Sequence, residues 1–204
     1  QTGPAAYVLD QQHFMNSLAL QTIGKKDFSW EWVASNFYYD KNIQRWSDTL
    51  NSDGSLNQGA TGQIVDYHGT SWTNLDLRSN YKLNSKHMLS FGLHYDYNKL
   101  NVRQGSVPAG QWLNAGPWSG SLVSTSKGVT ETKAAWIQDA WSYSESVKVT
   151  TGLRLEHWNA HDGYVYASST GGAQPESSFT TLSPKLSVSW DLGSSWLMTP
   201  SYGR

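Results

Sequence analysis

The chain has 204 residues, no Cys and a formal net charge of −1. This length fits one all-β domain, and the lack of Cys excludes a disulfide framework and Cys-ligated metal sites. The near-zero net charge gives no support to a nucleic-acid surface. No stretch approaches about 18 consecutive apolar residues, so no transmembrane helix is predicted.

Eight strands are predicted in chain order, at residues 13–23, 29–46, 72–83, 88–103, 131–143, 147–158, 180–192 and 196–204. Four tight turns join alternate pairs of them, at Gly24–Asp27, Asn84–His87, Ser144–Ser146 and Gly193–Ser195. The remaining connections are long and polar, at 48–70, 105–130 and 163–180. Short turns at one end of a sheet and long loops at the other are typical of outer-membrane β-barrels.

The strand at 147–158 has the clearest alternation. Val149, Leu153 and Leu155 share one face, whereas Lys148 and Arg154 share the other, because side chains alternate across a strand. A Lys or Arg on the lipid face would cost about 2–4 kcal/mol at mid-membrane. The apolar set is therefore predicted to face lipid and the basic set the lumen.

The same pattern assigns Leu89, Phe91, Leu186 and Val188 to lipid. It assigns further polar residues to the lumen, namely Asp76, Arg78, His94 and Asp96. The register at 13–23, 29–46 and 131–143 is less regular. In 29–46 the face of Trp30 and Trp32 is taken as outward, and in 131–143 the two faces stay ambiguous. A soluble β-sandwich would also alternate, with its apolar face inward.

Aromatic residues gather at the strand ends. Eleven Trp and eleven Tyr stand against five Phe, so rings with a polar tip dominate, as they do between lipid and water. One set falls near the long loops, at 37–39, 95–97 and 157–158. The other falls near the tight turns, at Trp30, Trp141, Tyr143 and Trp196. We interpret them as two aromatic belts.

Four consecutive segments between 131 and 204 resemble strands of TonB-dependent outer-membrane receptors. These are Thr132–Trp141 (TKAAWIQDAW), Val147–Glu156 (VKVTTGLRLE), Leu182–Trp190 (LSPKLSVSW) and Trp196–Arg204 (WLMTPSYGR). They follow the family's order, with tight turns or loops where the family has them. Residues 13–103 are similar to the family only in their long, aromatic-rich alternating strands.

This resemblance implies an all-β fold, an antiparallel meander of about eight transmembrane strands from a large outer-membrane β-barrel. Residues 1–204 are expected to be part of one barrel domain, without the plug domain and the remaining strands of the same receptor. The implied function is active import of a scarce ligand, such as an iron–siderophore complex. The implied partners are lipid, the small-molecule ligand and a TonB-type energy-transducing protein, in the outer membrane of a Gram-negative cell.

No catalytic motif occurs in the sequence, so no enzyme activity, catalytic residue, cofactor or metal site is predicted. His157 and His161 are four residues apart, about 13 Å along a strand, which is too far to share one ion. The predicted ligand-binding residues are aromatic side chains in or beside the long loops, because loops carry specificity. They are Tyr67, Trp72, Trp112, Trp118 and Tyr164. Mutual packing of the loops would explain the same rings equally well.

Two other functions remain open from the sequence. One is a self-contained eight-stranded outer-membrane barrel with a structural or adhesive role, since eight strands can close a barrel. The other is a soluble β-sandwich that binds carbohydrate with exposed Trp and Tyr. An outer-membrane protease or lipase barrel is a minor enzymatic alternative.

Overall fold

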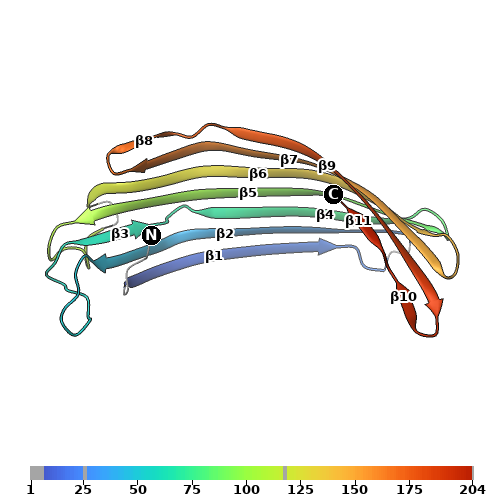
Figure 1. The fold of residues 1–204 in the computed structure, drawn as a ribbon, viewed down its shortest axis with the longest axis horizontal. Coiled ribbons are helices and arrows are strands. Elements are labelled where there is room, and N and C mark those ends of the chain that lie inside the picture. Colours follow the sequence, from blue (N-terminus) through green and yellow to red (C-terminus); the bar gives the residue numbers. More distant parts are fainter. Residues whose placement is uncertain (1–6, 25–26, 117–118, 204) are drawn as a thin grey trace.

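The computed structural model describes residues 7–24, 27–116 and 119–203, and these form one antiparallel sheet (Figure 1). The long strands are β1 (Val8–Gln21), β2 (Phe28–Ser47), β4 (Ser71–Lys82), β5 (His87–Val107), β6 (Ser121–Ser142), β7 (Val147–Ala167) and β9 (Ser177–Gly193). The short strands are β3 (Gly62–Asp66), β8 (Thr170–Ala173), β10 (Trp196–Met198) and β11 (Ser201–Gly203). Among the described residues, no helix is long and apolar enough to span a membrane.

Each long strand pairs with its sequence neighbours, as a meander requires. Between β2 and β5, β4 fills one half of the ladder and β3 continues it toward the other end. The predicted strand 196–204 is interrupted at Pro200, whose nitrogen cannot donate to the ladder. It therefore pairs with β9 in two pieces, β10 and β11. The all-β meander is confirmed.

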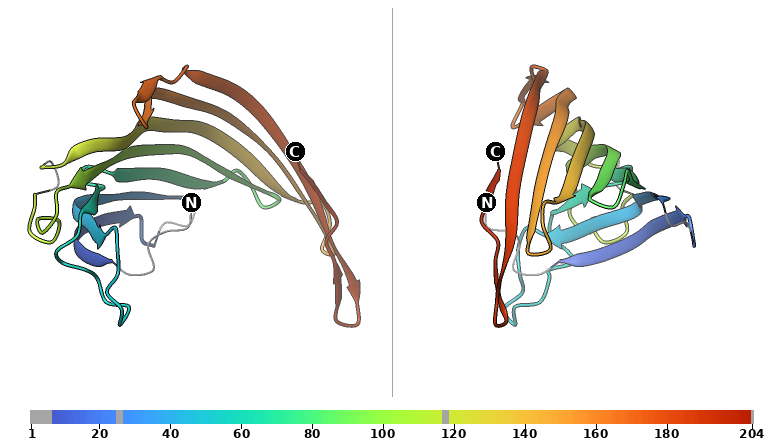
Figure 2. Two further views of the ribbon diagram at one scale, coloured as in Figure 1. Left: turned by 60° about the vertical axis from the view of Figure 1, so that its left-hand side comes forward. Right: turned by 90° about the vertical axis from the view of Figure 1, so that its right-hand side faces the viewer.

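The sheet is strongly arched, and its connections differ between its two ends (Figures 1 and 2). The tight turns lie at one end and the long connections at the other, as predicted. We call these the turn end and the loop end. The turn predicted at Gly24–Asp27 includes Lys25 and Lys26, which lie outside the described residues. An arched meander with this alternation is a partial barrel wall.

The strands are longer than predicted, and two predicted loops are largely sheet. β5 continues to Val107, β6 begins at Ser121 and β7 continues to Ala167. Of the 105–130 connection, the described residues 108–116 and 119–120 belong to no strand. The prediction failed because these outer segments lack an apolar face. They are rich in Ser, Thr and Val, and paired backbone groups hold them in the sheet without alternation.

The register places the predicted lipid-facing residues on one face and the lumen-facing residues on the other. Leu77, Leu93, Ala135 and Leu155 form one cross-strand row. Arg78, Gly92, Trp136 and Arg154 form the adjacent row on the opposite face. This agrees with the predicted split between Leu155 and Arg154 and with the outward assignment of Trp32, which is opposite Leu77.

The polar face is the concave one. Ala134 and Ala135 are adjacent and chemically identical, yet Ala134 on the polar face is 7 % exposed and Ala135 on the apolar face is exposed. Side chains converge on the inside of an arch and diverge on its outside, which explains the difference. A hollow on the polar face also touches every long strand from Gln21 of β1 to Lys185 of β9. The apolar face is therefore convex.

The apolar face is one band with a definite height. On β5 it runs from Leu89 to Tyr97 and ends at Lys99; on β7 it runs from Val147 to Leu155 and ends at His157. About nine to eleven residues suffice for a tilted strand to cross a bilayer. β5 has 21 residues and β7 has 21, so about half of each strand extends beyond the band at the loop end.

The ambiguous strand 131–143 is resolved by its partners. Trp136 lies on the concave face opposite Gly92 and Arg154, whereas Ile137 lies on the convex face opposite Phe91 and Leu153. Asp139 shares the convex face, where its carboxylate lies 2.7 Å from Nδ1 of His87. That imidazole provides a polar partner for a carboxylate on an otherwise apolar face.

The belt near the loops is only partly as expected. Tyr38, Tyr95 and Tyr97 lie on the convex face, but Phe37, Tyr39 and Trp158 lie on the concave face. Adjacent residues in a strand cannot share a face, so a run of consecutive aromatics must divide between the two. Only the convex members can contact lipid headgroups.

A small core covers the convex face at the loop end. Ile43, Ile64, Val107 and Trp112 are each at most 5 % exposed and pack together. Trp112 comes from the 108–120 connection and lies directly on Gly62, where a Cβ would be 2.5 Å from its Cγ. The loops at this end are thus held against the sheet by burial of apolar surface.

Gly92 is predicted to tolerate no side chain, in contrast to Gly152 on the same face. A Cβ at Gly92 would lie 2.3 Å from the Leu77 carbonyl oxygen and 2.8 Å from the Trp136 ring. At Gly152 it would meet chiefly the flexible Lys185 side chain, at 2.7 Å. We expect Gly92→Ala to cost about 1–3 kcal/mol through overpacking and Gly152→Ala to cost little. Urea unfolding in detergent measures both, and equal midpoints would contradict the close packing at Gly92.

Candidate functional site

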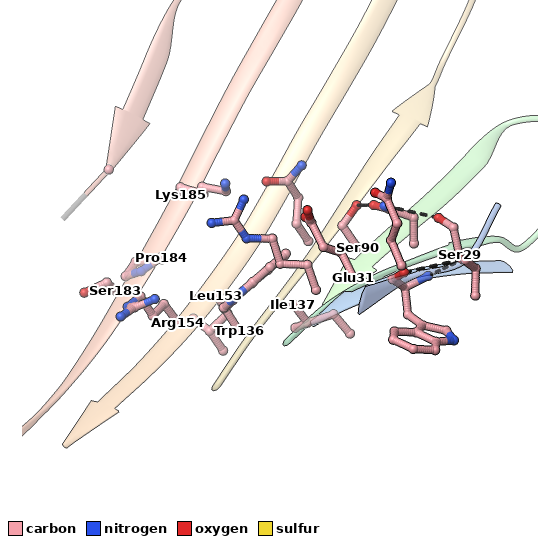
Figure 3. Close-up of a pocket in the computed structure, with 17 residues that line it drawn as sticks. Ser29, Glu31, Ser90, Trp136, Ile137, Leu153, Arg154, Ser183, Pro184 and Lys185 are labelled. Atoms are coloured by element: carbon pink, nitrogen blue, oxygen red, sulfur yellow. Dashed lines mark hydrogen bonds between the residues drawn. The ribbon is translucent and has the colours of Figure 1, made fainter. Parts of the chain in front are cut away.

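Two hollows lie on the concave face, one above the other. The larger has a volume of about 830 Å³ and spans the sheet near its turn end. Glu31, Ser90, Arg154 and Lys185 reach it from four different strands (Figure 3). Trp136 lies in its floor because Gly92 beneath it leaves room for the ring. Polar residues make up most of its lining, and they carry both signs of charge.

Two groups of charged side chains on the concave face are paired. Nε and Nη2 of Arg154 both donate to Glu156, at 2.9 and 2.7 Å. His94 lies between two carboxylates, with Nδ1 3.0 Å from Asp76 and Nε2 3.5 Å from Asp96. Asn74 donates to the second of these carboxylates. Such a paired and partly exposed surface suits contact with another polar protein surface.

The smaller hollow lies at the loop end and has a volume of about 390 Å³. Trp72, Asn98, Thr130 and Ala160 come from β4, β5, β6 and β7, and the register places them in one concave row. Gln174, between β8 and β9, closes the hollow on one side. Its floor is formed by small side chains, so the hollow exists because Gly128, Thr130 and Ala160 leave space.

Aromatic rings form a continuous group beside this hollow. Phe37 stacks on Trp72 with centroids 4.2 Å apart and planes 5° apart. His13 stacks on Tyr39 at 4.3 Å, and Tyr39 meets Trp72 edge-on at 5.9 Å. We call His13, Phe37, Tyr39 and Trp72 the aromatic wall. Stacked and edge-to-face pairs of this kind are favourable in themselves, so the four rings support one another.

The structure separates the predicted ligand-binding residues. Trp72 belongs to the aromatic wall and is 37 % exposed. Trp112 is 1 % exposed in the convex core, so its ring packs the loops, and a ligand contact is no longer expected there. Tyr164 is opposite Lys127 on the convex side, 40 % exposed, and Tyr67 is half-buried in the connection from β3 to β4. Trp118 lies outside the described residues.

Sequence reasoning missed three members of the aromatic wall. His13, Phe37 and Tyr39 stand in strands, where the sequence predicts a strand interior or a lipid belt. The missing information was the register, since His13 is opposite Tyr39 and Phe37 is opposite Trp72. A period-two reading of 29–46 already placed Phe37 and Tyr39 opposite Trp30, which was a usable signal that both face the lumen.

Two further His side chains, His157 and His161, each contact one polar side chain. His157 Nδ1 lies 2.9 Å from the Thr180 hydroxyl, and His161 Nδ1 lies 2.9 Å from the Asp162 carboxylate. Within the described ranges, no group of three or more His, Asp or Glu residues could hold a metal ion. The concave face itself provides hydrogen bonds, ring stacking and charge pairs.

Comparison with known proteins agrees with this architecture. A search of curated proteins found no match. A family model described as "TonB dependent receptor-like, beta-barrel" matches residues 2–204. Members of this family are transporters of the outer membrane. The arched meander, the apolar convex band and the polar concave face are what such a barrel wall requires, and the chain belongs to the TonB-dependent receptor β-barrel family.

Proposed function

We propose that the chain is part of one barrel domain of an outer-membrane receptor that imports a scarce ligand with energy from a TonB-type protein. An iron–siderophore complex is one example of such a ligand. The single observation that carries the proposal is the concave face, where two hollows lie one above the other between the loop end and the turn end. A ligand captured at the loops would meet the smaller hollow first.

The plug domain is the proposed occupant of the larger hollow. Glu31, Arg154 and Lys185 present both signs of charge there, which suits a polar protein surface more than a small apolar molecule. The remaining strands of the receptor are proposed to extend the sheet. Within the described residues, β1 has only β2 beside it, and a bilayer does not tolerate an unpaired edge.

Energised uptake tests this function. The whole receptor, encoded with its flanking sequence, would be produced in cells that retain or lack the TonB-type protein. The cells would be offered two labelled mixtures, ferric siderophores and oligosaccharides. Accumulation of at least one label only in cells that retain the TonB-type protein is expected. Uptake that is equal in both cell types, or absent for both mixtures, would contradict active import.

A further inference from the structure

Charge is divided sharply between the two faces at the loop end. Among the described strand residues there, six Lys and Arg side chains point to the convex side: Lys41, Arg45, Lys99, Arg103, Lys127 and Lys133. We define the outer wall as the strand residues that face the concave side and lie between the loop end and one cross-strand row. That row contains Asn74, Asp96 and Trp158. Of the described residues, the outer wall has no Lys or Arg, and the Asp96 carboxylate stands in the row that bounds it.

This distribution selects against anions. Lys99 is among the residues that line the smaller hollow, but the register puts its side chain on the convex side. A negatively charged ligand, such as an anionic iron chelate or a phosphate ester, would therefore lose hydration in the hollow without gaining a cationic partner. It would also approach the carboxylates of Asp96 and Asp76, and like charges placed together oppose binding. The site therefore suits an uncharged ligand.

The outer wall offers amide and hydroxyl groups instead. They belong to Asn42, Asn98, Gln104, Ser124, Ser126 and Thr130. Amides donate and accept, and hydroxyls do both, so these groups match a ligand that carries many hydroxyls. Asn98 and Thr130 lie in the smaller hollow itself, beside the ring of Trp72.

The aromatic wall provides the second half of the recognition chemistry. The rings of Phe37 and Trp72 stack face to face. Trp72 nevertheless remains 37 % exposed and borders the smaller hollow. Trp158 stacks on Phe179 at 5.1 Å on the same concave face, in the row that bounds the outer wall. A sugar ring has an apolar C–H face that packs on an aromatic ring, and hydroxyls at its rim that bond amides and hydroxyls.

We propose that the smaller hollow is a subsite for an uncharged carbohydrate, which stacks on Trp72 and bonds Asn98 and Thr130. This inference rests on the proposed import function and names its substrate class. The volume of about 390 Å³ falls at the lower end of the range usual for small-molecule sites. One or two sugar units would be held there while the rest of an oligosaccharide lies along the outer wall.

A glycan array tests the subsite on the whole receptor in detergent. The array would carry neutral oligosaccharides and acidic oligosaccharides, with an anionic ferric catecholate complex measured in parallel. Retention of neutral oligosaccharides is expected. Trp72→Ala should weaken that binding at least tenfold, which equals about 1.4 kcal/mol, whereas Trp72→Phe should restore most of it because a ring remains.

Two neighbouring serines provide the matched electrostatic control. Ser177 is opposite Ala160 on the concave face, and Ser178 is opposite Asn159 on the convex face; both are exposed. Ser177→Arg should add retention of acidic oligosaccharides, while Ser178→Arg should leave the array pattern unchanged. Both variants add the same charge, so a difference between them reports the face alone.

Three results would overturn the carbohydrate subsite. In the first, the receptor retains only the ferric complex or only acidic glycans. In the second, it retains no neutral glycan, and in the third, Trp72→Ala leaves the binding of neutral glycans unchanged. Energised uptake of a ferric siderophore without any glycan binding would refute the subsite and leave the transport function intact. Glycan binding without energised uptake would support the subsite and contradict the transport function.

Discussion

Ile137→Arg is expected to prevent stable insertion of the receptor in a bilayer, whereas Gln138→Arg is expected to insert normally. Ile137 is 52 % exposed near the middle of the convex apolar band, and Gln138 is the next residue on the same strand, facing the larger hollow. An Arg on the lipid face at mid-membrane costs about 2–4 kcal/mol. On the concave face its guanidinium stays in a polar environment.

Folding into lipid vesicles, followed by the shift in gel mobility on heating, measures this difference. The two variants lie on the same strand and introduce the same Arg side chain and the same charge. They differ in the residue that is replaced, which is apolar at Ile137 and polar at Gln138. Leu93→Ser on the convex face serves as a further control for loss of apolar area without a charge. Equal folding of Ile137→Arg and Gln138→Arg would mean that the assignment of the two faces is wrong.

Trp112→Ala should release the loops at the loop end without unfolding the barrel wall. Its side chain is 1 % exposed, packs with Ile64 and Val107, and donates from Nε1 to the Asn57 carbonyl at 3.3 Å. Truncation of a buried Trp typically costs about 3–5 kcal/mol. That loss falls on the convex core, because the long ladders from β5 to β7 do not depend on it.

Hydrogen exchange locates the effect. The Gly110 amide donates to the Ala60 carbonyl at 3.1 Å and so joins the two loops. Its exchange should accelerate strongly in Trp112→Ala, while amides in the middle of β6 should keep their protection. Trp72→Ala is the matched control, since Trp72 is 37 % exposed and should leave Gly110 protected. Acceleration throughout the sheet would show that the core supports the whole fold.

The strand pairs and the two faces could be predicted wherever one strand face is apolar. The alternation at 147–158 fixes the side of Leu153 and of Arg154, because a wrong choice would expose a charge to lipid. The same reasoning could not settle 131–143, where Lys133, Ile137 and Asp139 lie on one face. Only its partner strands decide there, and a partner's register is a long-range property.

The candidate site was less accessible to sequence reasoning. The sequence predicts Trp72 as a ligand-binding residue beside a long loop. Its companions could not be predicted because stacking joins residues far apart in the chain, such as His13 with Tyr39 and Phe37 with Trp72. Trp112 resembled Trp72 in its polar surroundings, yet one ring is buried and the other is not. Aromatic residues between polar ones signal either packing or binding, and burial alone distinguishes the two.

The length of the strands beyond the apolar band has a mechanical consequence. β5 pairs with β6 from Lys99 to Ser106. On its other side it pairs with β4 at Lys99 and with β3 from Arg103 to Val107, and nine residues of strand measure about 30 Å. The rim around the smaller hollow is therefore a stiff collar rather than a set of flexible flaps. Movement at this rim is therefore expected in the long connections above the collar rather than in the strands, and force applied at the rim passes directly into the barrel wall.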